Sequence, residues 1–350
     1  MVHNVSRKPW REEPDAADSA RPDPAPSASA RQSLASAHFT SEPARPHDRP
    51  AEVPTGVGSH RRARAQRRAA ILFILPAGIG FVFFFLSPTL QGIYYSFTQY
   101  NILGKPRFIG TANFVKLLHD PLFWNAMKIT LWYVVLNIGF QTIIALGLAV
   151  LMQRLTRSIL IRSTLLLPWL VSNVIAALVW FWMLDYQIGI VNIVLEHFGL
   201  DKIAFFADSH WAIPTIAFVN VWRYMGYTAL LIFAGLVAIP ENVYEAAALD
   251  GCTPVKAFFK VTLPLLRPVL AMVLVLSITG SFQVFDTVAV TTRGGPVNVT
   301  RVIQYYIWQK SFAEGQFGYG AALSTVLFVI LAVVAFVQIK LMRANESDLA

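Results

Sequence analysis

Six long runs with almost no charge constrain the fold of this chain more than any other feature of its sequence. They cover about 70–97, 127–153, 163–184, 211–239, 268–291 and 317–339. About 20 mostly apolar residues allow a helix to cross the hydrocarbon core of a bilayer. Charged residues make up 14% of the chain, against about 25% in soluble domains. We therefore predict an all-α integral membrane protein with six transmembrane helices. Buried helices of a soluble core are the weaker interpretation, because six such runs leave little water-facing surface.

Residues 1–60 have a different composition from the membrane domain that we assign to residues 61–350. The first 60 residues hold nine prolines and no apolar run of helix length, and their seven basic and eight acidic residues nearly cancel. A segment of this kind buries too little apolar area to offset its chain entropy. We predict a disordered cytoplasmic tail. It lacks the apolar stretch of a signal peptide.

The Lys and Arg residues that flank the runs predict an orientation. An arginine cluster precedes the first run and consists of Arg61, Arg62, Arg64, Arg67 and Arg68. With this cluster inside, the inner flanks carry thirteen Lys and Arg and the outer loops carry eight. Inner loops of membrane proteins are enriched in these residues, so both termini are predicted to be cytoplasmic. We interpret the cluster as a topological anchor and not as a nucleic-acid site, because an apolar run follows at once.

This sequence lacks the residues on which several enzyme classes depend for their chemistry. The phosphate-binding pattern G-x-x-x-x-G-K-[ST] is absent, as is H-E-x-x-H. Cys252 is the one cysteine, which excludes an internal disulfide and a cysteine-only zinc site. Neither acidic pairs nor histidine chains line the runs, so a proton-driven carrier lacks its relay. We expect no catalytic residue and no metal ligand in the chain.

The loop between the fourth and fifth runs, residues 240–267, has the pattern of two short helices joined by a tight turn. Glu241 suits the start of the first helix, and Gly251 suits its end. Thr253 suits the cap of the second helix, and Pro264 is predicted to stop it. Such a loop can bind another protein or merely connect two spans. The residues alone favour the simple connection.

The same loop resembles the cytoplasmic signature loop of ABC-importer permeases. That signature consists of Glu-Ala-Ala, a Gly six residues after the Glu, and then Ile-x-Leu-Pro. The matching residues are Glu245, Ala246, Ala247, Gly251, Leu263 and Pro264, with Asp250 beside the glycine. Val261 replaces the usual Ile, and Cys252 stands where Ala is common. The resemblance covers nearly all of 69–343 and is nearest to carbohydrate-uptake permeases of the glycerol-phosphate, lactose and maltose type, specifically the first of their two membrane subunits.

This resemblance implies a type I ABC importer permease fold in the inner membrane of a bacterial-type cell. The signature loop of the family docks into a groove of a separate ATPase subunit. The implied partners are a second homologous permease, two ATP-binding cassette subunits and an external solute-binding protein. ATP and magnesium then belong to the ATPase, and the chain itself carries no cofactor. The lipid bilayer is the remaining expected partner, and no nucleic acid is expected to bind.

Polar side chains within the fourth and fifth runs are candidates for the substrate pathway. Such residues are costly in a membrane and usually face the interior of the bundle. The candidates are Asn220, Arg223, Tyr224 and Tyr227 in the fourth run and Gly280, Ser281, Gln283 and Asp286 in the fifth. The four in the fourth run share one helical face. Aromatic rings, amides and a carboxylate suit a sugar, whose ring stacks and whose hydroxyl groups form hydrogen bonds.

Other interpretations of these residues remain open. Each pathway candidate can instead serve helix–helix hydrogen bonding, and for Arg223 we favour a structural or gating role. Asn137 and Gln141 share a face of the second run with Tyr133 and are predicted to act first in packing and second in the pathway. The leading function is the transmembrane subunit of an ATP-driven sugar importer. The alternatives are a permease for glycerol phosphate, a polyol or another solute, in which a phosphate would make Arg223 a ligand, and a membrane scaffold that does not transport.

Overall fold

The computed structural model describes residues 58–101, 103–155 and 158–346, and the side chains of 70–101, 103–153 and 158–340 within them. The predicted disordered tail therefore lies outside the described residues except for its last three. Residues 1–73 and 74–350 form two units and are described separately. Within the first unit, the described part is the start of helix α2, Gly58–Phe81. The side chains of the arginine cluster lie outside the described ones.

The predicted runs correspond to helices with different degrees of continuity. The first run continues from α2 through a π-helical turn, Val82–Leu86, into α3, Ser87–Ser96. The second, fourth and sixth runs correspond to α5, Pro121–Leu155, α9, Ala212–Val237, and α16, Phe317–Glu346. Five of the described helices are long and apolar enough to cross a membrane, and the count is six if a bent pair forms one span. The protein is thus largely helical, as predicted.

The third run is not one straight helix. It consists of α6, Ile159–Leu170, and α7, Asn173–Met183, which meet at 91°. Pro168 lies in the last turn of α6, where it removes a backbone donor, and Val171 and Ser172 are extended. The predicted span 163–184 therefore contains a break that we did not predict, because a lack of charge indicates an apolar environment and says nothing of continuity.

The fifth run is also interrupted. Helix α13 covers Arg267–Phe282, and a short helix, α14, covers Asp286–Val290 after a break of three residues. Asp286 therefore begins a new helix and does not lie within a continuous span. Both interrupted runs lie next to the same region of the bundle, since α7 packs on α14.

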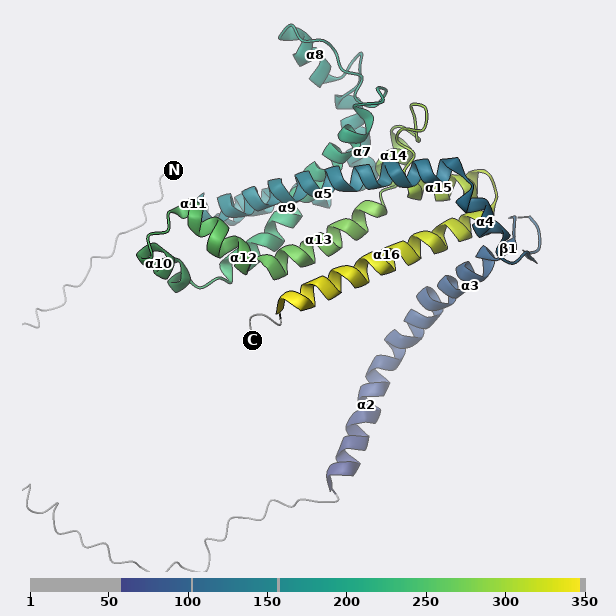
Figure 1. The fold of residues 1–350 in the computed structure, drawn as a ribbon, viewed down its shortest axis with the longest axis horizontal. Coiled ribbons are helices and arrows are strands. Elements are labelled where there is room, and N and C mark those ends of the chain that lie inside the picture. Colours follow the sequence, from purple (N-terminus) through teal and green to yellow (C-terminus); the bar gives the residue numbers. More distant parts are fainter. Residues whose placement is uncertain (1–57, 102, 156–157, 347–350) are drawn as a thin grey trace, which may run out of the picture. The chain divides into compact units, whose positions relative to one another are not determined.

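Figure 1 shows α5, α9, α13 and α16 running side by side in the unit of residues 74–350. Helices α5 and α9 contact each other along their length. Fully buried alanines, Ala145 and Ala149 on α5 and Ala229 on α9, allow this close approach. Gly226 on α9 has the same effect against α6, because a Cβ at this position would overlap the carbonyl oxygen of Leu165.

Short elements lie at the two ends of these helices (Figure 1). One end carries α10, Glu241–Leu249, α11, Pro254–Ala257, a π-helical turn, Phe258–Thr262, and α12, Leu263–Leu265. The other end carries α4, Ala112–Leu118, α15, Ile303–Trp308, and the π-helical turn Gln309–Ala313. There β1, Thr98–Gln99, pairs antiparallel with β2, Arg107–Phe108, in the register Thr98 to Phe108. Helix α8, Ile190–His197, follows α7.

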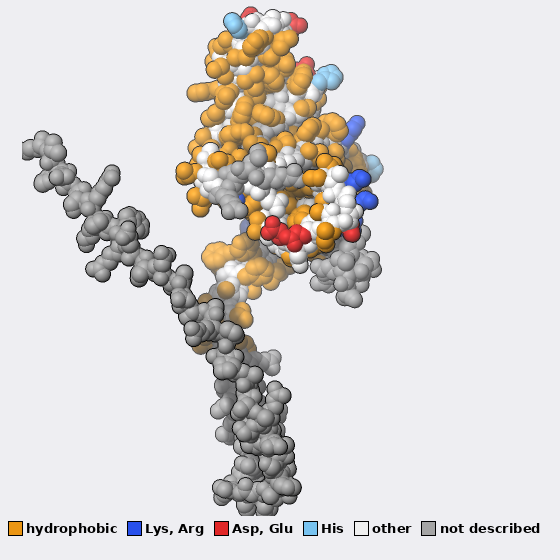
Figure 2. Space-filling model, turned by 90° about the vertical axis from the view of Figure 1, so that its left-hand side faces the viewer, with side chains coloured by type: hydrophobic (Ala, Val, Ile, Leu, Met, Phe, Trp, Pro, Cys, Tyr) orange, Lys and Arg blue, Asp and Glu red, His pale blue; other side chains and the backbone are white. Residues whose placement is uncertain are grey.

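Apolar side chains cover most of the described surface in Figure 2. Large hydrophobic residues are exposed along the helices, for example Val135 and Ile143 on α5 and Val333 and Phe336 on α16. Contiguous apolar surface of this extent is unfavourable in water, and a lipid environment removes the cost. The exposed surface and the helix lengths together establish a protein that crosses a membrane several times.

Candidate functional site

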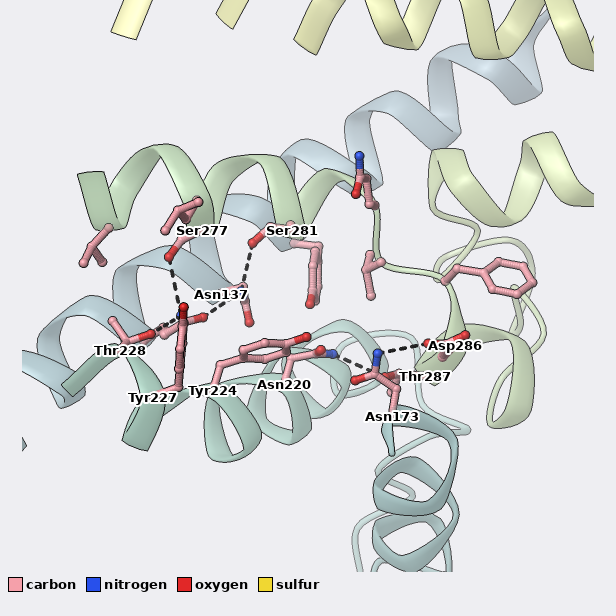
Figure 3. A pocket seen from close by; sticks show the side chains of 18 of the residues that line it. Asn137, Asn173, Asn220, Tyr224, Tyr227, Thr228, Ser277, Ser281, Asp286 and Thr287 are labelled. Carbon is pink, nitrogen blue, oxygen red and sulfur yellow. Dashed lines mark hydrogen bonds between the residues drawn. The ribbon is translucent and has the colours of Figure 1, made fainter. Parts of the chain in front are cut away.

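A polar pocket with a volume of about 310 Å³ lies among α5, α9, α13 and α14 (Figure 3). Its volume is at the lower end of the range for small-molecule sites. Seven of the eight pathway candidates line it, which are Asn220, Tyr224, Tyr227, Gly280, Ser281, Gln283 and Asp286. Residues from two separate runs of the sequence therefore meet at one cavity.

Arg223 is the candidate that does not line the pocket. Its Nε donates a hydrogen bond of 2.8 Å to the carbonyl oxygen of Val171, and its Nη2 donates one of 3.2 Å to that of Trp169. These carbonyls belong to the end of α6, where the last turn of a helix leaves acceptors without intrahelical donors. The structural role that we favoured for Arg223 agrees with this geometry.

Aromatic rings support the same region. Trp169 of α6 stacks on Tyr227 of α9 with ring centroids 4.9 Å apart and an angle of 10° between the planes. The guanidinium of Arg223 lies 4.8 Å from the centre of the Tyr224 ring. Because Tyr224 and Tyr227 line the pocket, the end of α6 supports Tyr227 directly and Tyr224 through Arg223.

Asp286 connects the two broken runs. Its Oδ2 accepts a hydrogen bond of 2.9 Å from Nδ2 of Asn173, the first residue of α7 (Figure 3). Asp286 itself is the first residue of α14. The helix starts on both sides of the pocket are thus held together by one side-chain pair, and no contact between Asp286 and Arg223 exists among the described hydrogen bonds and ion pairs.

Amide side chains of α5 form the base of the pocket. Asn137 Nδ2 donates to Ser281 Oγ at 2.9 Å and to Gln141 Oε1 at 3.3 Å. Gln141 Nε2 donates to Thr228 Oγ1 at 2.8 Å. This network joins α5, α9 and α13, as the packing interpretation predicted. The same residues, with Tyr133, also line the pocket.

Sequence reasoning missed three polar residues of the pocket, Asn173, Thr228 and Thr287. Asn220 Nδ2 donates to Thr287 Oγ1 at 3.3 Å, so the missed threonine holds a predicted residue. For Asn173 a signal existed, because Ser172 and Asn173 follow Pro168 within an apolar run and have the pattern of a helix start. The two threonines carry no such signal, since threonine is ordinary in a membrane helix.

The predicted coupling loop forms a compact turn at the end of α10. Gly251 has φ of +74°, its N–H donates to the carbonyl of Ala248 at 3.0 Å, and the N–H of Cys252 donates to that of Ala247 at 2.9 Å. This pair of bonds is the Schellman arrangement, which requires a left-handed residue. The glycine is therefore needed for the turn, as predicted.

The residues of the loop differ in their exposure to solvent. Ala247 is buried against the protein, whereas Glu245, Ala246 and Asp250 are exposed. Leu249 is 89% exposed, and Val255 and Phe259 are exposed apolar neighbours on the following elements. An exposed leucine of this kind, next to small residues that permit close approach, is typical of a protein-binding surface.

The second helix of the loop begins as predicted but does not end at Pro264. Thr253 Oγ1 accepts from the N–H of Lys256 at 3.4 Å and so caps α11. The backbone then passes through the π-helical turn Phe258–Thr262 into α12, which contains both Leu263 and Pro264. The wider turn accommodates the missing N–H of the proline, since π-helical turns shift the hydrogen-bond register. Helical structure continues into α13.

A second polar cluster lies at the opposite end of the bundle. Asp120, directly before α5, accepts hydrogen bonds from the hydroxyls of Tyr306 and Tyr319. Burial raises the pKa of the Asp120 carboxyl, but the bonds from both tyrosines and from the backbone N–H of Leu122 outweigh it and lower the pKa below its usual value. Burial and the bond to Asp120 raise the pKa of the Tyr306 hydroxyl. The cluster joins α5, α15 and α16.

Within the described residues, no group of three or more His, Cys, Asp or Glu side chains has the geometry to hold a metal ion. A helical bundle with exposed apolar walls and a polar pocket between interrupted spans is typical of a solute permease. The chain belongs to the family described as binding-protein-dependent transport system inner membrane component, whose model matches residues 121–343. It is a transmembrane transport subunit of an ABC importer, as the signature loop indicated, and not an enzyme.

Curated relatives match most of their own length. The permease protein SmoG of the sulfoquinovosyl glycerol transport system of Agrobacterium fabrum is 33% identical over 284 residues, which are 80% of this chain and 92% of the relative. The trehalose/maltose permease protein MalF of Thermococcus litoralis is 30% identical, over 79% of this chain and 95% of its own. The sn-glycerol-3-phosphate permease protein UgpA of Escherichia coli O157:H7 is also 30% identical, over 83% and 99%.

Solved structures share the fold. A bacterial ABC transporter involved in the import of the acidic polysaccharide alginate contains a chain with a TM-score of 0.72 and 25% identity, over 81% of this chain and 99% of that one. The alginate transporter in complex with an alginate pentasaccharide-bound periplasmic protein gives a TM-score of 0.68 and 26% identity, over 80% and 94%. The type I importer permease fold is therefore established for this chain.

Proposed function

We propose that this chain forms half of a sugar pathway across the inner membrane and that its pocket among α5, α9, α13 and α14 holds the sugar during import. The observation that carries this proposal is the composition of the pocket. Tyr133, Tyr224 and Tyr227 offer ring faces, while Asn220, Ser281 and Asp286 offer hydrogen-bonding groups. Rings that stack on a pyranose and polar groups that meet its hydroxyls are the general means of sugar recognition.

A second homologous permease completes the pathway in this proposal. This chain encloses the pocket only in part, which leaves room for a second chain to complete it. The sugar arrives from an external solute-binding protein, which is the arrangement named for the alginate transporter that shares this fold. With the N-terminus inside, both termini and the α10–α12 end face the cytoplasm, and the α4–α15 end receives the binding protein.

The α10–α11 turn couples this pathway to two ATP-binding cassette subunits, which hold ATP and magnesium. Leu249 and Ala246 give α10 an exposed apolar surface that fits a groove, and Glu245 provides a negative charge beside it. The continuous helical connection from α11 through α12 into α13 is the feature that supports coupling. A displacement of α10 by the ATPase is thereby passed to the helix that carries Gly280 and Ser281.

The pocket favours sugars over glycerol phosphate. A phosphate ligand is best paired with a cation, but no Lys, Arg or His is among the described residues that line the pocket, and Arg223 donates hydrogen bonds to backbone carbonyls outside it. A scaffold without transport activity has no use for a polar cavity between spans, because buried polar groups in a membrane are costly.

Purification and uptake test the proposal. The tagged chain is extracted from its own membrane in mild detergent, and its companions are identified by mass spectrometry. We expect a second permease and an ATPase, and we expect the complex in proteoliposomes with its binding protein to accumulate labelled sugar when ATP is supplied. A chain that emerges alone, and to which no ATPase crosslinks at Cys252, contradicts the proposal.

A pair of matched variants tests the pocket itself. A side chain at Gly280 points into free space beside the cavity, since a Cβ there meets no atom within 4 Å. Gly280→Leu is therefore expected to fill the pocket and abolish uptake while the complex still assembles. Gly139→Leu on the exposed face of α5, where a Cβ also meets nothing, serves as the control and keeps uptake. Normal uptake by Gly280→Leu would move the sugar site elsewhere.

A further inference from the structure

The hydrogen-bond donors and acceptors of the pocket distinguish neutral sugars from anionic ones. A neutral sugar offers hydroxyl groups, which donate and accept, whereas a phosphate or carboxylate group offers acceptors only and carries a charge. The relatives do not decide between them, because their names include both trehalose/maltose and glycerol-3-phosphate. The question therefore has to be answered from the side chains of this chain.

Three of the five side-chain amides that line the pocket have their N–H donors engaged. Each side-chain amide has two N–H groups. Asn137 uses both on Ser281 and Gln141, and Gln141 uses both on Thr228 and Ser277 at 2.8 and 3.5 Å. Asn220 uses both on the carbonyl of Ile216 and on Thr287, at 3.2 and 3.3 Å. These amides have no N–H left for the anionic oxygens of a ligand.

The acceptors of the same residues are free. The Oδ1 atom of Asn137, a residue only 4% exposed, has no hydrogen-bond partner among the described residues. No described donor reaches Oδ1 of Asn220 or Oδ1 of Asp286 either. A buried acceptor without a partner is unfavourable, and a ligand hydroxyl can satisfy it. The remaining donors are the amide of Gln283, the second N–H of Asn173 and the hydroxyls of Ser, Thr and Tyr. All of them are neutral and carry no charge to pair with an anion.

The charge of the pocket also favours a neutral ligand over an anion. Among the described residues that line it, Asp286 is the one carboxylate, and none is Lys, Arg or His. Asp286 keeps its Oδ2 on Asn173, so its charge is fixed beside the cavity. A ligand anion placed there would be repelled by this carboxylate and would find no cation among the lining residues to offset the loss of its hydration.

We infer that the pocket accepts neutral polyhydroxylated sugars and excludes their phosphorylated and uronic-acid counterparts, with Asp286 as the residue that sets this preference. The inference rests on the proposed function of the pocket and adds the substrate class to it. Asp286 recognises the ligand because its free Oδ1 atom accepts a hydrogen bond from a ligand hydroxyl group. Asn137 and Asn220 provide further acceptors in the same cavity.

Paired probes test the inference on the purified complex in nanodiscs, without the binding protein. Binding is measured by saturation-transfer difference NMR for trehalose against trehalose 6-phosphate and for methyl α-glucoside against methyl α-glucuronide. We expect the neutral member of at least one pair to bind about tenfold or more tightly than its anion. Equal or tighter binding of the anions overturns the inference, and so does a lack of binding by all four probes.

Asp286→Asn isolates the charge. Asparagine still accepts from Asn173 and gains an N–H donor for an anionic ligand. We expect this variant to bring the affinities of the paired probes close together, whereas Asp201→Asn, an exposed loop residue outside the pocket, keeps the difference. An unchanged preference in Asp286→Asn overturns the role of this carboxylate.

The result is distinguishable from failure of the proposed function. ATP-driven uptake of a phosphorylated or acidic sugar by the wild-type complex with its binding protein would refute the inference and leave the importer intact. A complex that takes up no sugar of either kind would refute the proposed function as well. The comparison of wild-type affinities stands even if the Asp286→Asn complex fails to assemble.

Discussion

The Nε atom of Arg223 on α9 donates a hydrogen bond of 2.8 Å to the carbonyl oxygen of Val171, the residue at which α6 ends and the chain turns by 91° into α7. A cation within a membrane span is costly unless it satisfies buried acceptors. Here it satisfies carbonyls that the break in the helix exposes. The one charge within the fourth run and the break in the third run therefore explain each other.

Replacement of Arg223 by methionine is expected to loosen this break. The change leaves the carbonyls of Val171 and Trp169 without their donors, and loss of such bonds costs about 1–3 kcal/mol. The melting temperature of the purified complex should fall accordingly. The melting temperature of Arg223→Lys should fall less, because its ammonium group reaches one carbonyl but lacks the planar guanidinium that reaches two. Arg107→Met, which alters an exposed arginine of β2, controls for loss of a positive charge. An Arg223→Met complex as stable as this control would contradict the prediction.

Gly251→Pro is expected to uncouple ATP hydrolysis from uptake. Gly251 has φ of +74°, whereas proline requires about −65° and lacks the N–H that bonds Ala248. The end of α10 must then change its direction. We expect normal membrane insertion, residual ATPase activity and uptake reduced to background, measured on the same proteoliposomes.

Gly199→Pro is the matched control for this variant. Gly199 has φ of +73° and ends α8 with the same pair of hydrogen bonds, from its own N–H to Glu196 and from Leu200 to Leu195. The two variants thus break identical turns at different places. Loss of coupling in both variants, or in neither, would show that the turn after α10 has no special part in coupling.

Glu245→Lys reverses an exposed charge on α10 without disturbing its turn. Glu245 makes no hydrogen bond or ion pair with another described residue, and its side chain is exposed. We expect the melting temperature of the isolated chain to stay unchanged while co-purification of the ATPase falls strongly. Glu241→Lys, one turn earlier on the same helix, distinguishes a specific contact from general repulsion.

The sequence predicted the parts of this fold that depend on the length of its apolar runs. The fourth run at 211–239 and helix α9 at Ala212–Val237 differ by only one or two residues at each end. The turn after α10 was also predictable, because Gly251 and Thr253 act through local backbone geometry. Local rules of this kind need no knowledge of the neighbours.

The breaks in the third and fifth runs depend on contacts distant in sequence. The extended backbone at Val171 is stabilised by Arg223, which lies 52 residues away. The start of α14 is held by Asn173, which is 113 residues from Asp286. A single sequence shows that these residues are polar but not that they meet. For the same reason Arg223 was included with the pathway residues although its side chain is directed elsewhere.

Gly226→Ala is expected to separate α6 from α9. A Cβ at Gly226 would overlap the backbone of Leu165, which cannot move aside as a flexible side chain can. Overpacking of this kind costs about 1–3 kcal/mol. The melting temperature of the complex should fall, and uptake should fall with it because Tyr224 and Tyr227 flank this glycine. Gly147→Ala on α5, where a Cβ meets no atom within 4 Å, should be neutral or slightly stabilising. A stable Gly226→Ala complex would show that the helices can separate without cost.

Asp120 is expected to make the stability of the α4–α15 end depend on acid pH. Hydrogen bonds from Tyr306 and Tyr319 lower the pKa of its carboxyl below the ordinary value of 3.8 in spite of burial. A carboxyl whose pKa is lower in the folded state stabilises the protein above its unfolded pKa, and this contribution is lost as the pH falls through the folded value. The contribution should therefore be constant from pH 7 to about pH 5, should decline below about pH 4, and is lost once the pH falls below the lowered pKa.

Comparison with Asp120→Asn isolates this effect from the acid sensitivity of the rest of the complex. Asparagine cannot ionise and offers the two tyrosine hydroxyls a weaker, neutral acceptor, so the variant should be less stable at pH 7 by about 1–3 kcal/mol. The difference in melting temperature between wild type and variant should then shrink as the pH is lowered from 7 to 3, because the wild-type carboxyl begins to take up a proton. Asp201→Asn should show no difference at either pH. A gap between wild type and Asp120→Asn that stays constant down to pH 3 would mean that the tyrosine hydroxyls do not stabilise the ionised carboxylate.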